Sequence, residues 1–256
     1  MNKEMRLEGK VAVIFGGVGR IGRTAAEAFL AQGASVLLVD RALDALDSVA
    51  RDFNLSFPGM CEKLCVEIES KEDVQRLIDF IVERLGRVDV LLNSPAYIYR
   101  APFLEHSIEE VDKQWQTNFR IVYLVAQAVA KLMAKQKSGK IINIASLGGT
   151  RPEKEHVGHC AVKSAVIALT KVMALELAEY NIQVNVIAPG PTETIPFSSP
   201  YYINHPEALK SIENRTPAGR IGRTSDHAGL LVFLASGESD WITGQVVLSD
   251  GGMGLA

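Results

Sequence analysis

Short runs of valine, isoleucine and leucine alternate with amphipathic helical patterns along the chain, and this alternation constrains the fold more than any other feature. The apolar runs do not alternate regularly with polar residues, which is typical of strands covered on both faces of a sheet. They lie at residues 11–15, 35–39, 62–68, 88–92, 140–145, 183–188 and 245–248. Helical patterns separate them at residues 21–32, 43–52, 71–85, 107–135, 156–180 and 225–235.

Strands that alternate with helices predict a parallel sheet joined by right-handed crossovers. We therefore expect a doubly wound α/β fold, with seven parallel strands and helices on both faces. The chain has 256 residues, 47% of them hydrophobic, which suffices for one domain with a sizeable core. We predict a single domain over residues 1–256.

Composition and charge narrow the range of partners. A formal net charge of −3 does not favour nucleic acid, whose recognition needs a concentrated basic face. No run approaches the roughly 20 apolar residues of a membrane span, and the first ten residues do not resemble a signal peptide. Three cysteines match neither a disulfide framework nor a zinc module. We expect a cytoplasmic protein without a metal site.

Residues 195–223 interrupt the alternation of strands and helices. This segment contains four prolines and the paired tyrosines Tyr201 and Tyr202. A long insertion after a late strand is more often functional than a plain connection. We predict that it forms a lid over a substrate.

A glycine-rich turn joins the first strand to the first helix. The glycines permit a tight turn and let backbone N–H groups approach a pyrophosphate at the helix N-terminus. Arg20 and Arg23 add positive charge there. Because the pattern lies between a strand and a helix, it predicts a phosphate site. Its residues are Gly16, Gly19, Arg20, Ile21 and Gly22.

Asp40 follows the second strand, 18 residues after Gly22. A carboxylate at this place accepts both hydroxyls of a cofactor ribose and repels a 2′-phosphate. Arg41 has the opposite effect, because a guanidinium pairs with such a phosphate. Since Arg41 is free to turn away, the pair favours NAD over NADP.

Further landmarks appear in a fixed order, and with them the chain resembles the short-chain dehydrogenase/reductase family from Gly9 to Gly252. Asn118 follows Trp115 in the fourth helical pattern, Ser146 follows the strand at 140–145, and Lys163 lies in the next helix. Pro189, Gly190 and Thr194 follow the sixth strand, and Asp250-Gly251-Gly252 lies near the C-terminus.

The resemblance implies a Rossmann fold, a nicotinamide cofactor and a homotetramer or homodimer. It also implies roles for particular residues. Ser146 would bind the substrate oxygen, Lys163 would hold the ribose and lower the pKa of a catalytic tyrosine, and Asn118 would order a water relay. Further cofactor contacts would come from Asn93, Pro189, Gly190 and Thr194.

Three departures from the family pattern stand out. Phe15 replaces the opening threonine and Arg20 the central glycine of the first turn, and Ser94-Pro95-Ala96 follows Asn93. The catalytic tyrosine aligns with His159. The spacing supports this alignment, because Ser146 lies 13 residues before His159 and Lys163 lies four after it.

A histidine at this position favours one direction of reaction. Residues four apart share a helix face, so His159 and Lys163 project toward one site. The neighbouring ammonium and burial both lower the pKa of the imidazole and keep it neutral. Neutral imidazole is a competent base for alcohol oxidation and a poor acid for carbonyl reduction. We expect oxidation of a secondary alcohol, with a rate that falls as the pH drops through the histidine pKa.

Other interpretations remain open. His159 would merely fill space in a catalytically impaired protein that binds nucleotide for regulation, and a lyase or isomerase would reuse the same crevice. His156, three residues earlier, would share a metal with His159, but no third ligand is evident. A structural or substrate contact is the favoured role for His156.

Two sets of residues suggest partners. Aromatic residues near the expected site indicate a small alcohol or carbonyl substrate that is partly apolar or aromatic, and Tyr97 or Tyr99 is an alternative source of the missing hydroxyl. The aromatic set is Tyr97, Tyr99, Phe103, Tyr201 and Tyr202. Surplus apolar positions on two long helices predict packing between subunits. They are Val122, Val125, Val129, Val166, Leu169 and Val172.

Overall fold

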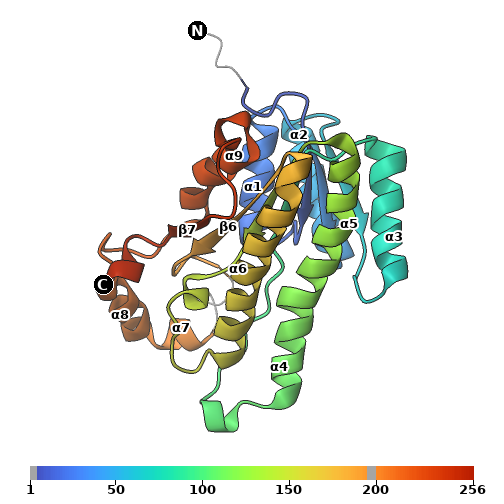
Figure 1. Ribbon diagram of the computed structural model, residues 1–256. Coiled ribbons are helices and arrows are strands. Elements are labelled where there is room, and N and C mark those ends of the chain that lie inside the picture. Colours follow the sequence, from blue (N-terminus) through green and yellow to red (C-terminus); the bar gives the residue numbers. More distant parts are fainter. Residues whose placement is uncertain (1–4, 195–199) are drawn as a thin grey trace.

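Seven parallel strands form one sheet in the order β3-β2-β1-β4-β5-β6-β7 (Figure 1). This computed structural model describes residues 5–194 and 200–256, with the backbone alone at 200 and 201. The predicted doubly wound sheet is confirmed. The strands are β1 (Val11–Phe15), β2 (Ser35–Asp40), β3 (Cys61–Cys65), β4 (Val90–Asn93), β5 (Gly139–Ile144), β6 (Ile182–Pro189) and β7 (Val246–Ser249).

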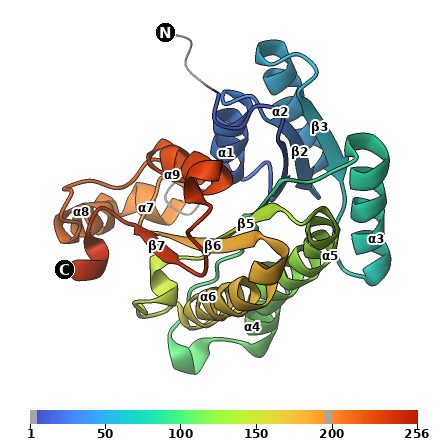
Figure 2. The same cartoon turned by 45° about the horizontal axis from the view of Figure 1, so that its top comes forward.

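Helices cover both faces of the sheet (Figure 2). One layer contains α1 (Arg20–Leu30), α2 (Leu43–Ser56) and α9 (Ala228–Ala235). The other contains α3 (Lys71–Phe80), α5 (Ile121–Gln136) and α6 (Val157–Leu177), and α4 (Ile108–Trp115) extends beyond the sheet. Two large hydrophobic cores result, with a third, smaller cluster around Val166 and Val186. In β1, Ala12 and Ile14 enter the first core, whereas Val13 and Phe15 enter the second.

The predicted helix at 107–135 is interrupted by a π-helical turn at Gln116–Arg120, which separates α4 from α5. Such turns occur often at functional sites because they displace one residue out of the helical register. Here the turn carries Asn118 into the interior, where it is fully buried. A second π-helical turn, Ile81–Leu85, ends the helix predicted at 71–85.

Two expectations about apolar residues need correction. The strand predicted at 62–68 ends at Cys65, and Val66 and Ile68 are buried beyond its end. The residues expected to pack between subunits lie mostly in the core of this chain instead, because two sheet faces absorb more apolar surface than expected. Those buried are Val122, Val125, Val129 and Val166, while Leu169 is half-buried and Val172 is exposed.

The segment predicted as a lid contains α7 (Pro200–Asn204) and α8 (Pro206–Arg215). Its residues 195–199, Pro196 among them, lie outside the described part of the chain. None of the described helices is long and apolar enough to cross a membrane.

Candidate active site

One large pocket opens at the carboxyl ends of the strands. Its volume is about 1040 Å³. It lies where β1 and β4 are neighbours and the strand order reverses, which is the usual ligand position in open α/β sheets. Its lining extends from the glycine-rich turn to Ser146, His159 and Lys163. Residues predicted to hold a cofactor and residues predicted to catalyse therefore share one cavity.

The glycine-rich turn is built by close backbone contacts. Gly16 has φ +80°, and a Cβ atom there would lie 2.8 Å from the Ser94 backbone. A Cβ atom at Gly22 would lie 2.2 Å from the Gly16 carbonyl oxygen. Helix α1 starts directly after Gly19, and no side chain caps its first N–H groups. Those donors remain for an anion such as a pyrophosphate.

The two arginines of the turn have different surroundings. Arg20 lines the pocket, and its Nη1 donates to the Glu193 carbonyl oxygen at 3.5 Å. Arg23 forms an ion pair with Asp52 at 3.3 Å on the outside of α1 and α2. Only Arg20 therefore adds a cation to the phosphate end of the pocket.

Asp40 is fixed at the end of β2 by three backbone N–H groups. One carboxylate oxygen accepts from Arg41 at 2.8 Å and Ala42 at 3.3 Å, and the other accepts from Val18 at 3.4 Å. The Arg41 guanidinium pairs instead with Glu67 at 2.7 Å. The carboxylate is thus oriented by the chain, while the neighbouring cation is already paired.

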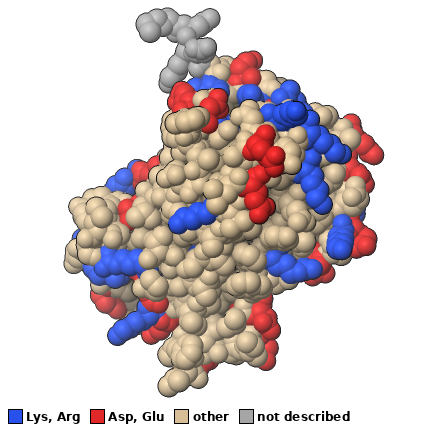
Figure 3. All heavy atoms as spheres, viewed as in Figure 1, with Lys and Arg blue, Asp and Glu red and all other residues tan. Residues whose placement is uncertain are grey.

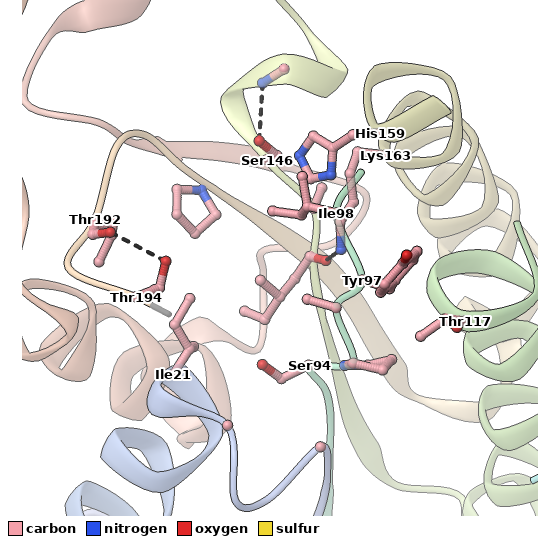
Figure 4. A pocket seen from close by; sticks show the side chains of 18 of the residues that line it. Ile21, Ser94, Tyr97, Ile98, Thr117, Ser146, His159, Lys163, Thr192 and Thr194 are labelled. Carbon is pink, nitrogen blue, oxygen red and sulfur yellow. Dashed lines mark hydrogen bonds between the residues drawn. The ribbon is translucent and has the colours of Figure 1, made fainter. Parts of the chain in front are cut away.

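Ser146, His159 and Lys163 project into the pocket from β5 and α6 (Figure 4). The Ser146 Oγ accepts a hydrogen bond from the Gly148 N–H at 3.1 Å, which leaves its hydroxyl proton to donate elsewhere. Lys163 is buried, and its Nζ donates to the Ile144 carbonyl oxygen at 2.9 Å. The His159 Nδ1 is buried without a hydrogen-bond partner among the described residues.

Burial determines the charge of these groups. It lowers the pKa of His159 to about 3, and the positive charge of Lys163 acts in the same direction. Burial also lowers the pKa of Lys163 to about 8. Both effects favour the neutral imidazole, and desolvation has a larger effect than the ammonium. Lys163 is the group that changes charge near neutral pH.

Three predicted site residues do not line the pocket. Gly22 lies behind the turn, where it packs α1 against Gly16. Asn93 is buried, and its Nδ2 donates to the Asn143 Oδ1 at 2.9 Å. The Asn118 amide forms two hydrogen bonds with the backbone of Tyr97: its Oδ1 accepts from the N–H at 2.8 Å, and its Nδ2 donates to the carbonyl oxygen at 2.7 Å. Each supports a pocket wall rather than facing the cavity.

Pro189, Gly190 and Thr194 line the pocket on the side of α8. A Cβ atom at Gly190 would lie 2.7 Å from Asp250, so this loop fits tightly against the C-terminal residues. The Thr194 Oγ1 donates to the Thr192 carbonyl oxygen at 3.3 Å (Figure 4). The loop after β6 therefore lines the same cavity as the glycine-rich turn.

The expected group of aromatic residues is only partly present. Tyr97 and Tyr202 line the pocket, whereas Phe103 is exposed and Tyr99 packs edge-on against His106. The side chain of Tyr201 lies outside the described residues. The Tyr97 hydroxyl donates to the Glu110 carboxylate at 2.7 Å. Tyr97 is thus engaged elsewhere, and neither Tyr97 nor Tyr99 replaces the missing hydroxyl.

Arg100 is a lining residue that the sequence did not reveal. It follows Tyr97 and Tyr99 in the loop after β4, and a cation within an aromatic cluster was the available signal. Its Nε donates to the His156 Nε2 at 2.6 Å. The His156 Nδ1 contacts the Lys154 carbonyl oxygen at 2.8 Å, so both ring nitrogens are used within the protein.

In the described part of the chain no cluster of acidic, histidine or cysteine residues could hold a metal.

The cavity fits a nicotinamide dinucleotide. The glycines leave room for a pyrophosphate above α1, and uncapped N–H groups face that space. Asp40 and Ser146 line the same continuous cavity. The fit of the dinucleotide rests on the backbone geometry of the glycine-rich turn and on the Asp40 carboxylate.

Known proteins resemble the chain over nearly its full length. The protein family described as enoyl-(acyl carrier protein) reductase matches residues 17–254. The 3-oxoacyl-(acyl-carrier-protein) reductase of Thermotoga maritima is 34% identical over 250 residues, which are 97% of this chain and 99% of the relative. Sorbitol dehydrogenase of Cereibacter sphaeroides is 35% identical over 256 residues, with 97% and 98% covered.

Among solved structures, a gluconate 5-dehydrogenase from Burkholderia cenocepacia in complex with NADP and tartrate has a TM-score of 0.93. It is 33% identical, and the match covers 99% of this chain and 98% of that one. The chain therefore belongs to the short-chain dehydrogenase/reductase family, the nicotinamide-dependent oxidoreductases of alcohols and carbonyl compounds.

Proposed function

We propose that the protein oxidises a secondary alcohol with NAD, using His159 in the place of the family's tyrosine. One observation carries this proposal: a single cavity joins the uncapped N-terminus of α1 to Ser146, His159 and Lys163. A protein that only bound nucleotide would not need three polar groups at the far end of that cavity. When bound, the nicotinamide supplies the acceptor for a hydride.

Four residues of the chain would orient the substrate, accept its proton and hold the walls of the cavity. The Ser146 hydroxyl donates a hydrogen bond to the substrate oxygen and orients it. The neutral His159 imidazole accepts the hydroxyl proton as the alcohol is oxidised. Lys163, held by the Ile144 carbonyl oxygen, keeps its amine at the cofactor side of the same wall. Asn118 is a positioning residue, because it fixes the Tyr97 backbone that forms the opposite wall.

The low pKa of His159 changes the expected pH dependence. A residue with a pKa of about 3 stays neutral throughout the range from pH 5 to 8. The loss of rate that we expect when His159 is protonated should therefore occur below pH 5. A neutral imidazole donates no proton readily, so the oxidation direction is favoured over carbonyl reduction.

The test is to incubate the protein with NAD and a panel of secondary alcohols while following NADH absorbance. We expect turnover, and His159→Gln should lower kcat by roughly 10²–10⁴-fold, the usual contribution of a general base. The affinity for NAD should not change. His159→Tyr is the informative companion variant: a loss shows that this site is built for imidazole, whereas a gain shows that activity has decayed.

A second candidate function rests on the same histidine. An imidazole with a pKa of about 3 is a weak base, and its Nδ1 has no partner among the described residues. Both features suit a cofactor-binding regulatory protein without turnover. Calorimetric binding of NAD without any NADH formation, in wild type and in His159→Tyr, would favour this candidate.

We propose NAD rather than NADP because the Asp40 carboxylate lines the pocket at the end of β2, while Arg41 is paired with Glu67. The gluconate 5-dehydrogenase neighbour holds NADP and another relative is named an NAD-dependent glycerol dehydrogenase, so the family accommodates both cofactors. Residues 195–223 would act as the substrate lid, since Tyr202 and Ile212 line the pocket. Three free cysteines suit a reducing cytoplasm.

Assembly into a homotetramer or homodimer is also proposed, now on different residues. The face over α6 and α4 carries few charged side chains (Figure 3). Its exposed apolar side chains include Trp115, Tyr123, Val172 and Leu175. Light scattering coupled to size exclusion should report more than one chain, and Leu175→Glu should reduce the mass.

A further inference from the structure

Arg100 is a pocket cation held by two uncharged groups. Its Nε donates to the His156 Nε2 at 2.6 Å, and its Nη1 donates to the Tyr202 hydroxyl. The guanidinium also lies over the Tyr202 ring, 5.5 Å from its centre. These contacts come from the N-cap residue of α6 and from α7, so two segments distant in sequence fix the arginine. They use two of its five N–H donors.

His156 serves Arg100 as a neutral acceptor. Its Nδ1 lies 2.8 Å from the Lys154 carbonyl oxygen, which requires the proton on Nδ1 and leaves the lone pair on Nε2 for Arg100. Burial lowers the pKa of His156, and the charge of Arg100 lowers it further. The histidine therefore orients the guanidinium without neutralising its charge.

No carboxylate among the described residues forms an ion pair with Arg100. By contrast, Arg41 at the other end of the pocket is paired with Glu67 at 2.7 Å. Glu153 also lines the cavity, yet it forms no hydrogen bond with Arg100. A cation that lines a pocket, is fixed by neutral groups and retains three N–H donors is arranged to receive an anion.

We propose that Arg100, oriented by His156 and Tyr202, binds a carboxylate of the substrate. The inference rests on the proposed function and narrows its substrate class to hydroxycarboxylic acids and their oxo forms. A guanidinium matches the two oxygens of a carboxylate. Arg100 is a single guanidinium, and the Glu153 carboxylate lines the same cavity, so a monoanion suits the site better than the dianion of a phosphate ester.

The distance between the two sites sets the size of the substrate. The His156 and His159 rings are 6.1 Å apart, centre to centre. Arg100 is bonded to the Nε2 of His156 and has no hydrogen bond to His159. The carboxylate and the reacting hydroxyl should therefore be separated by several carbon–carbon bonds. A series of acids with increasing separation will locate the best length.

The binding test uses the NAD-loaded protein and needs no turnover. Titration calorimetry compares 2-hydroxybutanoate, 3-hydroxybutanoate, 4-hydroxypentanoate and 5-hydroxyhexanoate with the amide of each acid. We expect at least one acid to bind about tenfold or more tightly than its amide. Arg100→Gln should lower the affinity for that acid by about 10–100-fold, because a hydrogen bond to a charged group is lost. The affinity for the amide should not change.

Arg76→Gln is the matched control. Arg76 is an exposed arginine on α3, paired only with Asp73 in the described structure, and its loss changes the net charge equally. It should alter neither affinity. Thermal unfolding of each variant checks that the protein is folded. Arg100→Lys keeps the positive charge but not the paired N–H donors, so its affinity for the acid should lie between those of Arg100→Gln and the wild type.

The outcomes separate this inference from the proposed function. Equal binding of acids and amides, no binding of any acid, or equal weakening of both by Arg100→Gln would overturn the carboxylate site. Turnover of neutral alcohols together with any of these results leaves the proposed function intact. Binding of acids that depends on Arg100, with no NADH formed, would support the site and overturn the oxidation.

Discussion

The two ends of the pocket are built by different means. At the cofactor end, backbone atoms of consecutive residues do the work, through Gly16, Gly19 and the first turn of α1. At the substrate end, side chains from β5, α6, α7 and the loop after β4 meet around His159 and Arg100. The first end depends on local geometry, the second on tertiary contacts.

This difference shows where the chain tolerates change. Members of the family share the pyrophosphate of a nicotinamide dinucleotide, so its site needs one backbone shape. The substrate differs, and side chains supply that variation. The replacement of the tyrosine by His159 falls entirely at the second end. Substitutions that disturb backbone contacts should therefore abolish binding, whereas side-chain changes at either end should adjust specificity or rate.

Gly22→Ala should have the largest effect. The new Cβ atom would lie 2.2 Å from the Gly16 carbonyl oxygen, and because that neighbour is backbone, helix α1 must shift. A misplacement of about 1 Å is worth on the order of a hundredfold in a positioned site. We expect the Kd for NAD to rise by about that factor, as measured by calorimetry.

Gly229→Ala is the control for this variant. Gly229 lies in α9 with no atom within 4 Å of an added Cβ. Its replacement should leave NAD affinity unchanged and raise stability by roughly 0.5–1 kcal/mol, because glycine disfavours a helix. If Gly22→Ala binds NAD as well as Gly229→Ala does, the backbone does not define the cofactor end.

Acid should destabilise the wild type more than His159→Gln. The pKa of His159 is lowered to about 3 by burial, whereas an unfolded histidine has a pKa near 6.5. Between these values the unfolded chain binds a proton that the folded chain does not, so stability falls as the pH falls. From pH 7 to pH 4 this amounts to about 3 kcal/mol.

Urea unfolding of wild type and His159→Gln at the two pH values measures this difference. Other groups, His156 included, titrate in both proteins and cancel. A wild type that loses no more stability than the variant would show that His159 is hydrated and protonated at pH 4.

The fold was largely predictable from sequence because both sheet faces are covered. Runs such as Val11–Phe15 send alternate side chains into two cores, so every position is apolar and the pattern is strong. The π-helical turn at Gln116–Arg120 was not predictable, because its register shift leaves the apolar periodicity nearly intact. Likewise, sequence does not tell whether Val125 faces a subunit or its own core.

Site residues that belong to a local sequence motif were predictable. Site residues that depend on contacts between distant segments were not. Asp40, Ser146 and Lys163 stand at fixed positions relative to strands, and all three line the pocket. Arg100 acquires its role only through contacts with His156 and Tyr202, about 56 and 102 residues away. No local pattern records such a contact.

Asp40→Asn should change cofactor preference by about tenfold. The substitution removes the charge that repels a 2′-phosphate and weakens the acceptor for the ribose hydroxyls. We expect the ratio of NAD to NADP affinity to fall by roughly that factor, the value of one charge-assisted hydrogen bond. Asp47→Asn, an exposed carboxylate paired with Lys63, should not change the ratio. An unchanged ratio in Asp40→Asn would place the ribose elsewhere.

The smallest expected effect links the two ends through Lys163. Burial lowers its pKa to about 8, and its positive charge lowers the pKa of His159. As the pH rises through 8, loss of that charge makes the imidazole a stronger base. The kcat/KM for alcohol oxidation at saturating NAD should rise by about threefold to tenfold between pH 7 and 9. Lys163→Met should flatten this profile, since it removes the charge beside His159 that is lost near pH 8. A rise that persists in Lys163→Met would assign the titration to the substrate or the cofactor, and His159 would then act without electrostatic control from its neighbour.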